Sequence, residues 1–341
     1  MSRAFLLTPW FAAALSLAGP TSAVANCGAE GCPLSPHALE ASARRFTLDL
    51  GYQDVDQDRT WDGTHEATEP QPVGHVTELY TLTQTWSLNA RAQVLPSLRL
   101  TASLPYLERV HAHEACDLTF IPHQGTILHP GHFVTTRSEW NFDGLGDAIL
   151  YAQWTVLGSP GPGALMLQGG VKLPTGKRHV DEINGEEPEP PARPGTGSTD
   201  VIAGVQVLRS WDVPTFRGRR TLLPVVVSTM GRWNGQGTDG YRMGNELHVN
   251  LSTSYGLGRW ISLLAQGNAV LHGRDEVGNT DAEPHHTGGT SVFVTPGLRV
   301  ELLGGSALFG YWQIRAYERT NGPQLVAPSH LILGASFGLG L

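Results

Sequence analysis

Twelve segments of the sequence alternate apolar and polar side chains with a period of two. In segment 80–91, for example, Tyr80, Leu82, Trp86 and Leu88 share one face, and polar side chains occupy most of the other. The twelve segments are 46–53, 80–91, 98–106, 146–156, 165–173, 200–208, 222–233, 246–257, 261–272, 291–301, 306–317 and 330–341. Because successive side chains of a strand point to opposite faces, this period predicts twelve β-strands, each with one apolar face.

The connections between these segments alternate between long and short. The long ones are 54–79, 107–145, 174–199, 234–245, 273–290 and 318–329, and the short ones are 92–97, 157–164, 209–221, 258–260 and 302–305. An up-and-down barrel with short turns at one end and long loops at the other gives this pattern. Segments of about ten residues also match a tilted strand that crosses a bilayer.

The polar faces distinguish a membrane barrel from a secreted β-sandwich, which is the alternative fold. They are rich in Thr, Ser, Asn, Gln and Gly rather than in the Lys and Glu of a soluble surface, and only 16% of the chain is charged. Five tryptophans lie in or beside predicted strands, as in an interfacial aromatic girdle: Trp86, Trp140, Trp154, Trp233 and Trp260. We therefore expect residues 46–341 to form an all-β fold, an up-and-down antiparallel transmembrane β-barrel of about twelve strands with long outer loops and short periplasmic turns.

The first 25 residues have the pattern of a signal peptide. Arg3 precedes an apolar stretch at 5–17, and Ala23-Val24-Ala25 is a small-x-small cleavage site. We expect 26–45 to be a periplasmic N-terminal segment and the barrel to lie in the outer membrane of a Gram-negative-type bacterium, with outer-membrane lipid as a partner. The net charge of −8 and the lack of a basic block argue against a nucleic-acid partner.

Four short motifs follow one another in the middle of the chain. They are LPY at 104–106, GLGD at 144–147, LPTG at 173–176 and PGTGSTD at 194–200. In this order they resemble the outer-membrane barrels grouped as transporters of the phenol-degradation (MetA-pathway) type. The resemblance implies a β-barrel that passes small hydrophobic or aromatic compounds across the outer membrane. No cofactor is expected.

The last three motifs begin or end the fourth, fifth and sixth segments, so we expect them to meet at the outer rim. The alternation also predicts which ionisable side chains face the lumen: Arg99, Asp147, Lys172, Asp200, Glu246, His248, Arg299, Glu301 and Arg315. Such residues either pair to hold the wall together or tune what passes. A barrel of twelve strands is expected to enclose a narrow pore or a ligand-sized cavity. We therefore expect solute diffusion through a polar lumen gated by loops 107–145 and 174–199.

The histidines support an alternative function, a surface metal-binding or structural barrel. Ten of the 14 histidines fall in predicted outer loops. The run 111–116 offers His111, His113, Glu114 and Cys116, a donor set that zinc or copper accepts. The other reading of this run is a polar loop that tolerates histidine.

Two further readings concern cysteine and catalysis. Cys27 and Cys32 form a disulfide candidate after export, with a metal-capturing tail that includes His37 as the alternative. A barrel hydrolase is the third functional class, but the sequence has no Gly-x-Ser-x-Gly elbow, so an enzyme is not expected. The identity of the solute and the oligomeric state stay open at this stage.

Overall fold

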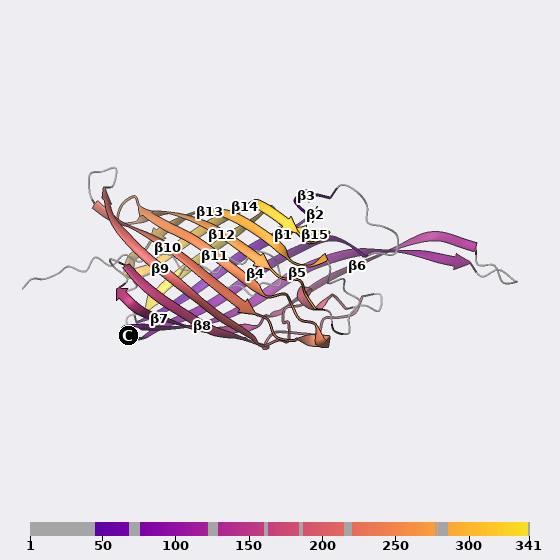
Figure 1. The fold of residues 1–341 in the computed structure, drawn as a ribbon, viewed down its shortest axis with the longest axis horizontal. Coiled ribbons are helices and arrows are strands. Elements are labelled where there is room, and N and C mark those ends of the chain that lie inside the picture. The colour runs from indigo at the N-terminus through magenta and orange to yellow at the C-terminus, as the bar shows by residue number, and fades with distance from the viewer. Residues whose placement is uncertain are drawn as a thin grey trace, which may run out of the picture.

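The predicted segments pair in chain order to form a closed barrel of twelve antiparallel strands (Figure 1). The computed structural model describes residues 45–67, 76–121, 129–159, 163–183, 187–214, 220–276, 278 and 286–339. The barrel strands are β1 (Phe46–Gln57), β4 (Val76–Leu95), β5 (Leu98–Ile121), β6 (His129–Leu145), β7 (Ala148–Ser159), β8 (Gly163–Leu173), β9 (Asp200–Pro214), β10 (Arg220–Trp233), β11 (Glu246–Gly256), β12 (Ile261–His272), β13 (Gly289–Glu301), β14 (Ser306–Thr320) and β16 (Ser329–Leu339). β1 pairs with both β4 and β16, which closes the sheet on itself. The predicted fold class is therefore confirmed.

The two ends of the barrel differ as the connections predicted. β1 begins and β16 ends at the end that carries the short turns, such as residues 96–97 between β4 and β5. We call this the inner end. The long connections lie at the opposite, outer end.

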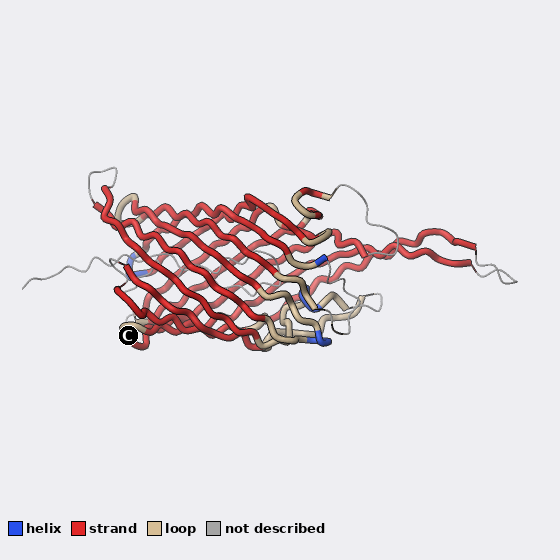
Figure 2. The backbone as a smooth tube through the Cα atoms, in the orientation of Figure 1, coloured by secondary structure: helices blue, strands red, loops and turns tan. Residues whose placement is uncertain are grey.

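Strands β6 and β7 together make one crossing of the barrel. The first part of β5 pairs with β7, and the part from Tyr106 to Ile121 pairs with β6. The prediction of a loop at 107–145 is therefore wrong, because β5 and β6 continue as a paired hairpin that projects beyond the outer rim (Figures 1 and 2). A hairpin held by backbone hydrogen bonds outside the bilayer needs no apolar face, so the alternation that marks the other strands is absent there.

Two of the other predicted loops also contain short strands. β2 (Arg59–Asp62) pairs with β3 (His65–Glu66) and with β15 (Gln324–Val326), which gives a small three-stranded sheet at the outer end. The backbone N–H of Thr320 donates to the carbonyl of Gly63 at 2.9 Å and ties this sheet to β14. The loops at 54–79 and 318–329 are thus partly ordered as strands rather than as irregular loops.

The apolar faces of the strands point away from the barrel axis. Leu50, Leu150 and Leu251 are 44%, 44% and 53% exposed, whereas their inward-facing neighbours Asp49 and Asn250 are 1% and 3% exposed. A continuous belt of exposed leucine, valine and tryptophan is stable against lipid and not against water. The protein is therefore a transmembrane barrel of the outer membrane, and the phase inversion that a secreted sandwich would require does not occur.

The tryptophans support the same orientation with one exception. Trp154 and Trp260 are exposed near the inner end, and Trp233 is exposed at the outer end, so two levels of the belt carry indole rings. Trp140 is 1% exposed and pairs across the hairpin with His111 on the lumen side. Its predicted place in the lipid-facing girdle is wrong, because β6 belongs to the hairpin.

The inner face of the barrel is packed with polar side chains at mid-height. Asn89, Asn268, Thr295 and Gln313 are at most 1% exposed. Asn268 accepts a hydrogen bond of 3.0 Å from the Thr295 hydroxyl and donates one of 2.8 Å to Asn250. At this level the structure therefore shows a closed interior rather than a wide aqueous pore.

Residues 1–44 lie outside the described part of the chain. The predicted signal peptide at 1–25, most of the segment 26–45, and Cys27 and Cys32 fall there and stay predictions. No helix in the described ranges is long and apolar enough to cross a membrane.

Candidate functional site

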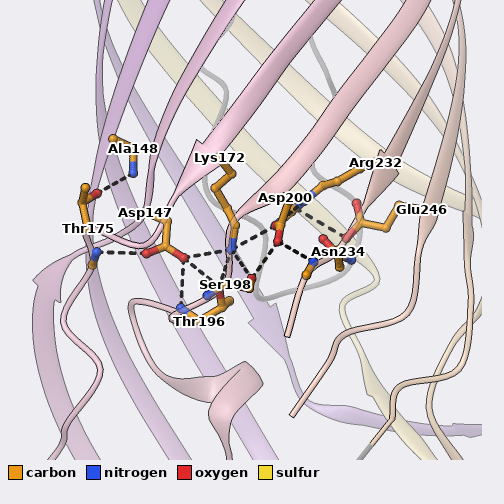
Figure 3. A network of polar contacts seen from close by, with 12 residues as sticks. Asp147, Ala148, Lys172, Thr175, Thr196, Ser198, Asp200, Arg232, Asn234 and Glu246 are labelled. Carbon is orange, nitrogen blue, oxygen red and sulfur yellow. Dashed lines mark hydrogen bonds and ion pairs between the residues drawn. The ribbon is translucent and has the colours of Figure 1, made fainter. Parts of the chain in front are cut away.

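The GLGD, LPTG and PGTGSTD motifs meet at the outer rim, where they surround one lysine. Asp147 lies just before β7, Lys172 near the end of β8, and Asp200 at the start of β9. Lys172 Nζ lies 2.9 Å from Asp147 Oδ2 and 3.0 Å from Asp200 Oδ2 (Figure 3). All three side chains are completely buried. The sequence prediction that these motifs converge is confirmed.

The loop that joins β8 to β9, residues 174–199, is bound to this lysine and to Asp147. Lys172 Nζ donates to the hydroxyls of Ser198, at 3.0 Å, and of Thr196. Asp147 accepts hydrogen bonds from the backbone N–H groups of Thr196 at 3.0 Å and of Gly176 at 2.9 Å. A buried ammonium is stable only when it is paired and its protons are satisfied, and here the loop supplies part of that set.

The chain of charges continues along the rim with one charge on each strand. Arg232 on β10 donates to Asp200 at 2.7 Å, and its guanidinium lies 3.6 Å from Glu246 on β11. Glu246 Oε2 lies 2.8 Å from His248 Nε2. Lysine, aspartate, arginine and glutamate therefore alternate in sign from β8 to β11 (Figure 3). The sequence did not identify Arg232, because segment 222–233 is largely apolar on both faces and its phase could not be assigned.

Two glycines explain why the motifs need glycine where the loop leaves and rejoins the rim. A Cβ atom on Gly195 would lie 2.5 Å from the carbonyl carbon of Gly176, and one on Gly176 would lie 2.6 Å from the Cα of Gly195. The LPTG and PGTGSTD backbones are thus in direct contact, and only glycine permits this approach.

The middle of the same loop is attached to the barrel wall at β5. Arg109 donates through Nε to the Thr83 hydroxyl at 2.9 Å and through Nη1 to the carbonyls of Pro191, at 3.3 Å, and Ala192. Pro191 and Ala192 belong to the short 3-10 helix η2 (Pro190–Ala192). The loop therefore folds into the mouth of the barrel and is held there from both sides. Arg109 was not a predicted site residue, because it falls in the stretch that the sequence assigned to a loop.

A cavity of about 200 Å³ lies beneath this loop at the outer end of the lumen. We call it the outer chamber. Its wall is built from strands on all sides of the barrel and from the long loops, and it includes Gln57, Thr81, Arg109, His111, Glu189, Pro191, Tyr241, Met243, Glu246, His248, Val270, His272, Asp275, Ser291, Glu318 and Leu325. Polar groups thus alternate with apolar surface, which is the usual composition of a small-molecule site.

Tyr241 links two of the loops that cover the chamber. Its hydroxyl donates to Asp275, which also accepts the backbone N–H of Gly244 at 2.7 Å. Burial of the phenol, together with the adjacent Asp275 carboxylate, raises the pKa of Tyr241 well above its ordinary value. The hydroxyl is therefore a hydrogen-bond donor at physiological pH.

The other predicted lumen residues do point inward, but they lie outside this chain of charges. Arg299 pairs with Glu301 near the inner end, and Arg99 donates to Gln93 there at 3.2 Å. Arg315 donates to the carbonyl of Ala327 at 2.7 Å and pairs with Glu318. The alternation therefore predicted orientation correctly, whereas it could not predict which residues come together.

The predicted metal ligands are only partly on one side of the hairpin. The rings of His111 and His113 both contact Trp140, at centroid distances of 5.7 Å and 4.7 Å. Glu114 follows on the opposite face of β5, and the side chain of Cys116 lies outside the described residues. Among the described residues, no group of three His, Cys, Asp or Glu side chains is placed to hold a metal ion.

Comparison with known proteins shows a likeness of fold. No protein-family profile and no curated protein matches the sequence. The COG4313 outer membrane channel from Pseudomonas putida F1 superposes with a TM-score of 0.59 and 13% identity over 89% of this chain and 99% of that one. The NanC porin has a TM-score of 0.44 at 8% identity over 86% and 100% of the two chains, and a Pseudomonas aeruginosa FadL homologue has 0.40 at 11% over 88% and 91%. With the closed twelve-strand barrel and its apolar belt, the first of these likenesses shows that the chain has the fold of an outer-membrane β-barrel channel.

Proposed function

We propose that the protein is a passive outer-membrane channel for small hydrophobic or aromatic molecules, with the outer chamber as the first station of the pathway. The observation that carries this proposal is the chamber itself. It lies at the outer mouth of a closed barrel, in line with a polar lumen, and long loops cover it. A solute that leaves the chamber toward the inner end moves along side chains that offer both donors and acceptors.

Two observations support this solute class. Pro191, Met243, Val270 and Leu325 give the chamber apolar surface beside its polar groups. The motif order also resembles the phenol-degradation group of outer-membrane barrels, for which hydrophobic or aromatic compounds are the implied cargo. The COG4313 structure, which is named as a channel, has a similar fold.

Loop 174–199 is the gate in this proposal. It lies in the mouth and is attached to the Lys172 network at its ends and to Arg109 in its middle. The 107–145 stretch is not part of the gate, because it forms the projecting hairpin. A solute therefore enters the lumen when the attachment to Arg109 is released while the rim attachments of the loop persist.

Single-channel recording in planar bilayers tests the proposal. The protein refolded in detergent is expected to give brief, low-conductance openings, and Arg109→Gln is expected to raise the open probability severalfold because a neutral amide holds the two carbonyls more weakly. Arg259→Gln is the matched control, since Arg259 stacks on Trp260 at the inner end, 4.2 Å from the ring centroid. No conductance above the lipid baseline in either protein would contradict the channel function.

A further inference from the structure

The outer chamber is strongly acidic. Its described lining contains five carboxylates, those of Glu78, Glu189, Glu246, Asp275 and Glu318, and one guanidinium, that of Arg109. Three of the carboxylates have partners within the wall: Glu246 has Arg232 and His248, Asp275 has Tyr241, and Glu318 has Arg315. The side chains of Glu78 and Glu189 are instead exposed, and both face the chamber. A solute in the chamber therefore meets an excess of negative charge.

The carboxylates are contiguous around Tyr241. Asp275, Glu189 and Glu78 all lie close enough to Tyr241 for their charges to oppose ionisation of its phenol. These three side chains come from the β12–β13 connection, the β8–β9 loop and β4, so the acidic wall bridges three parts of the outer end. The wall is thus assembled by the fold, rather than being one acidic run of the sequence.

A second observation is a buried hydrogen-bond acceptor that faces the same chamber. His248 is 3% exposed, and its Nε2 lies 2.8 Å from Glu246 Oε2. Because a carboxylate only accepts, Nε2 carries the proton of the neutral ring, and Nδ1 is then an acceptor. Nδ1 is buried without a hydrogen-bond partner among the described residues. A buried acceptor of this kind is satisfied by an N–H or O–H donor on a solute.

The remaining surface of the chamber fits an organic cation better than a metal ion. Met243, Val270 and Leu325 supply apolar contacts, and no three metal-binding side chains of the described residues converge on one point. The volume of about 200 Å³ is below that of a typical drug-sized site, so the solute is small. An anion would have Arg109 as its only cationic contact in the described lining, and Arg109 already holds two carbonyls of the loop.

We propose that the outer chamber recognises small amines, that is, organic ammonium ions with a short apolar or aromatic body. The ammonium lies at the acidic wall formed by Glu78, Glu189 and Asp275, the apolar body lies against Met243, Val270 and Leu325, and a further donor on the solute satisfies His248 Nδ1. This inference rests on the proposed channel function, and it narrows the hydrophobic or aromatic class to its cationic members.

Titration calorimetry with the full-length protein refolded in detergent tests the inference at pH 7. The probe is 2-phenylethylamine, with neutral 2-phenylethanol and anionic phenylacetate as matched compounds. The amine is expected to bind at least about tenfold more tightly than the alcohol, because one charge-assisted hydrogen bond contributes about that factor. Phenylacetate is expected to bind more weakly than either. Equal affinity for the amine and the alcohol, or no binding of the amine, would overturn the inference.

Substitution of the two exposed carboxylates locates the site. The double variant Glu78→Gln and Glu189→Gln is expected to lose about tenfold or more in affinity for the amine and to keep its affinity for the alcohol. The double variant Asp181→Asn and Glu182→Gln removes two exposed charges of the same loop that do not line the chamber, and it is expected to bind like the wild type. Equal losses in the two double variants would mean that overall charge, and not this site, attracts the amine.

Two further measurements keep the outcomes separate. A mobility shift between unboiled and boiled samples on a denaturing gel reports whether each variant forms the closed barrel, and Glu78→Gln alone replaces the double variant if the latter does not fold. Conductance without preference for the amine would leave the channel function standing and reject this inference. Amine binding without conductance would do the reverse.

Discussion

The outer and inner ends of the barrel use buried charge in different ways. At the outer end, Lys172, Asp200 and Arg232 connect three strands and hold a loop through Thr196 and Ser198. At the inner end, Arg299 pairs with a neighbour two residues away on its own strand. Charges that join separate segments fix a tertiary arrangement, whereas a local pair does not. The outer end is therefore the part of the barrel where electrostatics determine the shape of the mouth.

Removal of the central lysine is expected to have the largest effect on this contrast. Lys172→Met leaves Asp147 and Asp200 buried with one cation fewer, which is expected to lower the free energy of unfolding by about 3–5 kcal/mol. Arg299→Met is the matched inner-end variant and is expected to cost less, because Glu301 is 22% exposed and stays solvated. Guanidinium unfolding in detergent measures both. Equal losses would show that the outer network has no special role in stability.

A smaller effect is expected from a single methyl group where the two motifs touch. Gly195→Ala places a Cβ atom 2.5 Å from the Gly176 backbone, so the loop must shift, at a cost of about 1–3 kcal/mol. Gly169→Ala on β8 is the control, since its Cβ would meet no atom within 4 Å. The same unfolding measurement, combined with channel recording, shows whether the shift also changes the gate. A loss for Gly169→Ala as large as that for Gly195→Ala would contradict the close-approach explanation.

The sequence predicted those features that depend on the repeating environment of a membrane strand. Lipid on one side and polar packing on the other impose the period of two, so Asp147, Lys172 and Asp200 could be placed on the lumen side and at strand ends. Arg232 was missed because its strand is apolar on both faces. Arg109 and Trp140 were missed because a hairpin beyond the bilayer has no lipid-facing side. The chamber could not be predicted, since it depends on how loop 174–199 contacts β5, a long-range contact that leaves no local pattern.

The smallest expected effect concerns Tyr241, which carries the comparison into its pH dependence. The pKa of Tyr241 is raised in the folded protein above the model value of 10.0. The unfolded chain therefore loses this proton first, so the stabilisation is complete below about pH 10 and declines as the pH rises above it. The wild type is expected to lose about 1.4 kcal/mol of unfolding free energy per pH unit there relative to Tyr241→Phe.

Unfolding at several pH values between 8 and 11 measures this difference. Below pH 10 the two proteins are expected to differ by a constant amount, which is the worth of the hydrogen bond from the Tyr241 hydroxyl to Asp275. Above pH 10 the wild-type curve is expected to fall toward that of the phenylalanine variant. Parallel curves over the whole range would mean that Tyr241 ionises as readily in the folded barrel as in the unfolded chain. The loops over the chamber would then be open to water at the outer end, in contrast to the packed inner face that Asn89 and Gln313 show at mid-height.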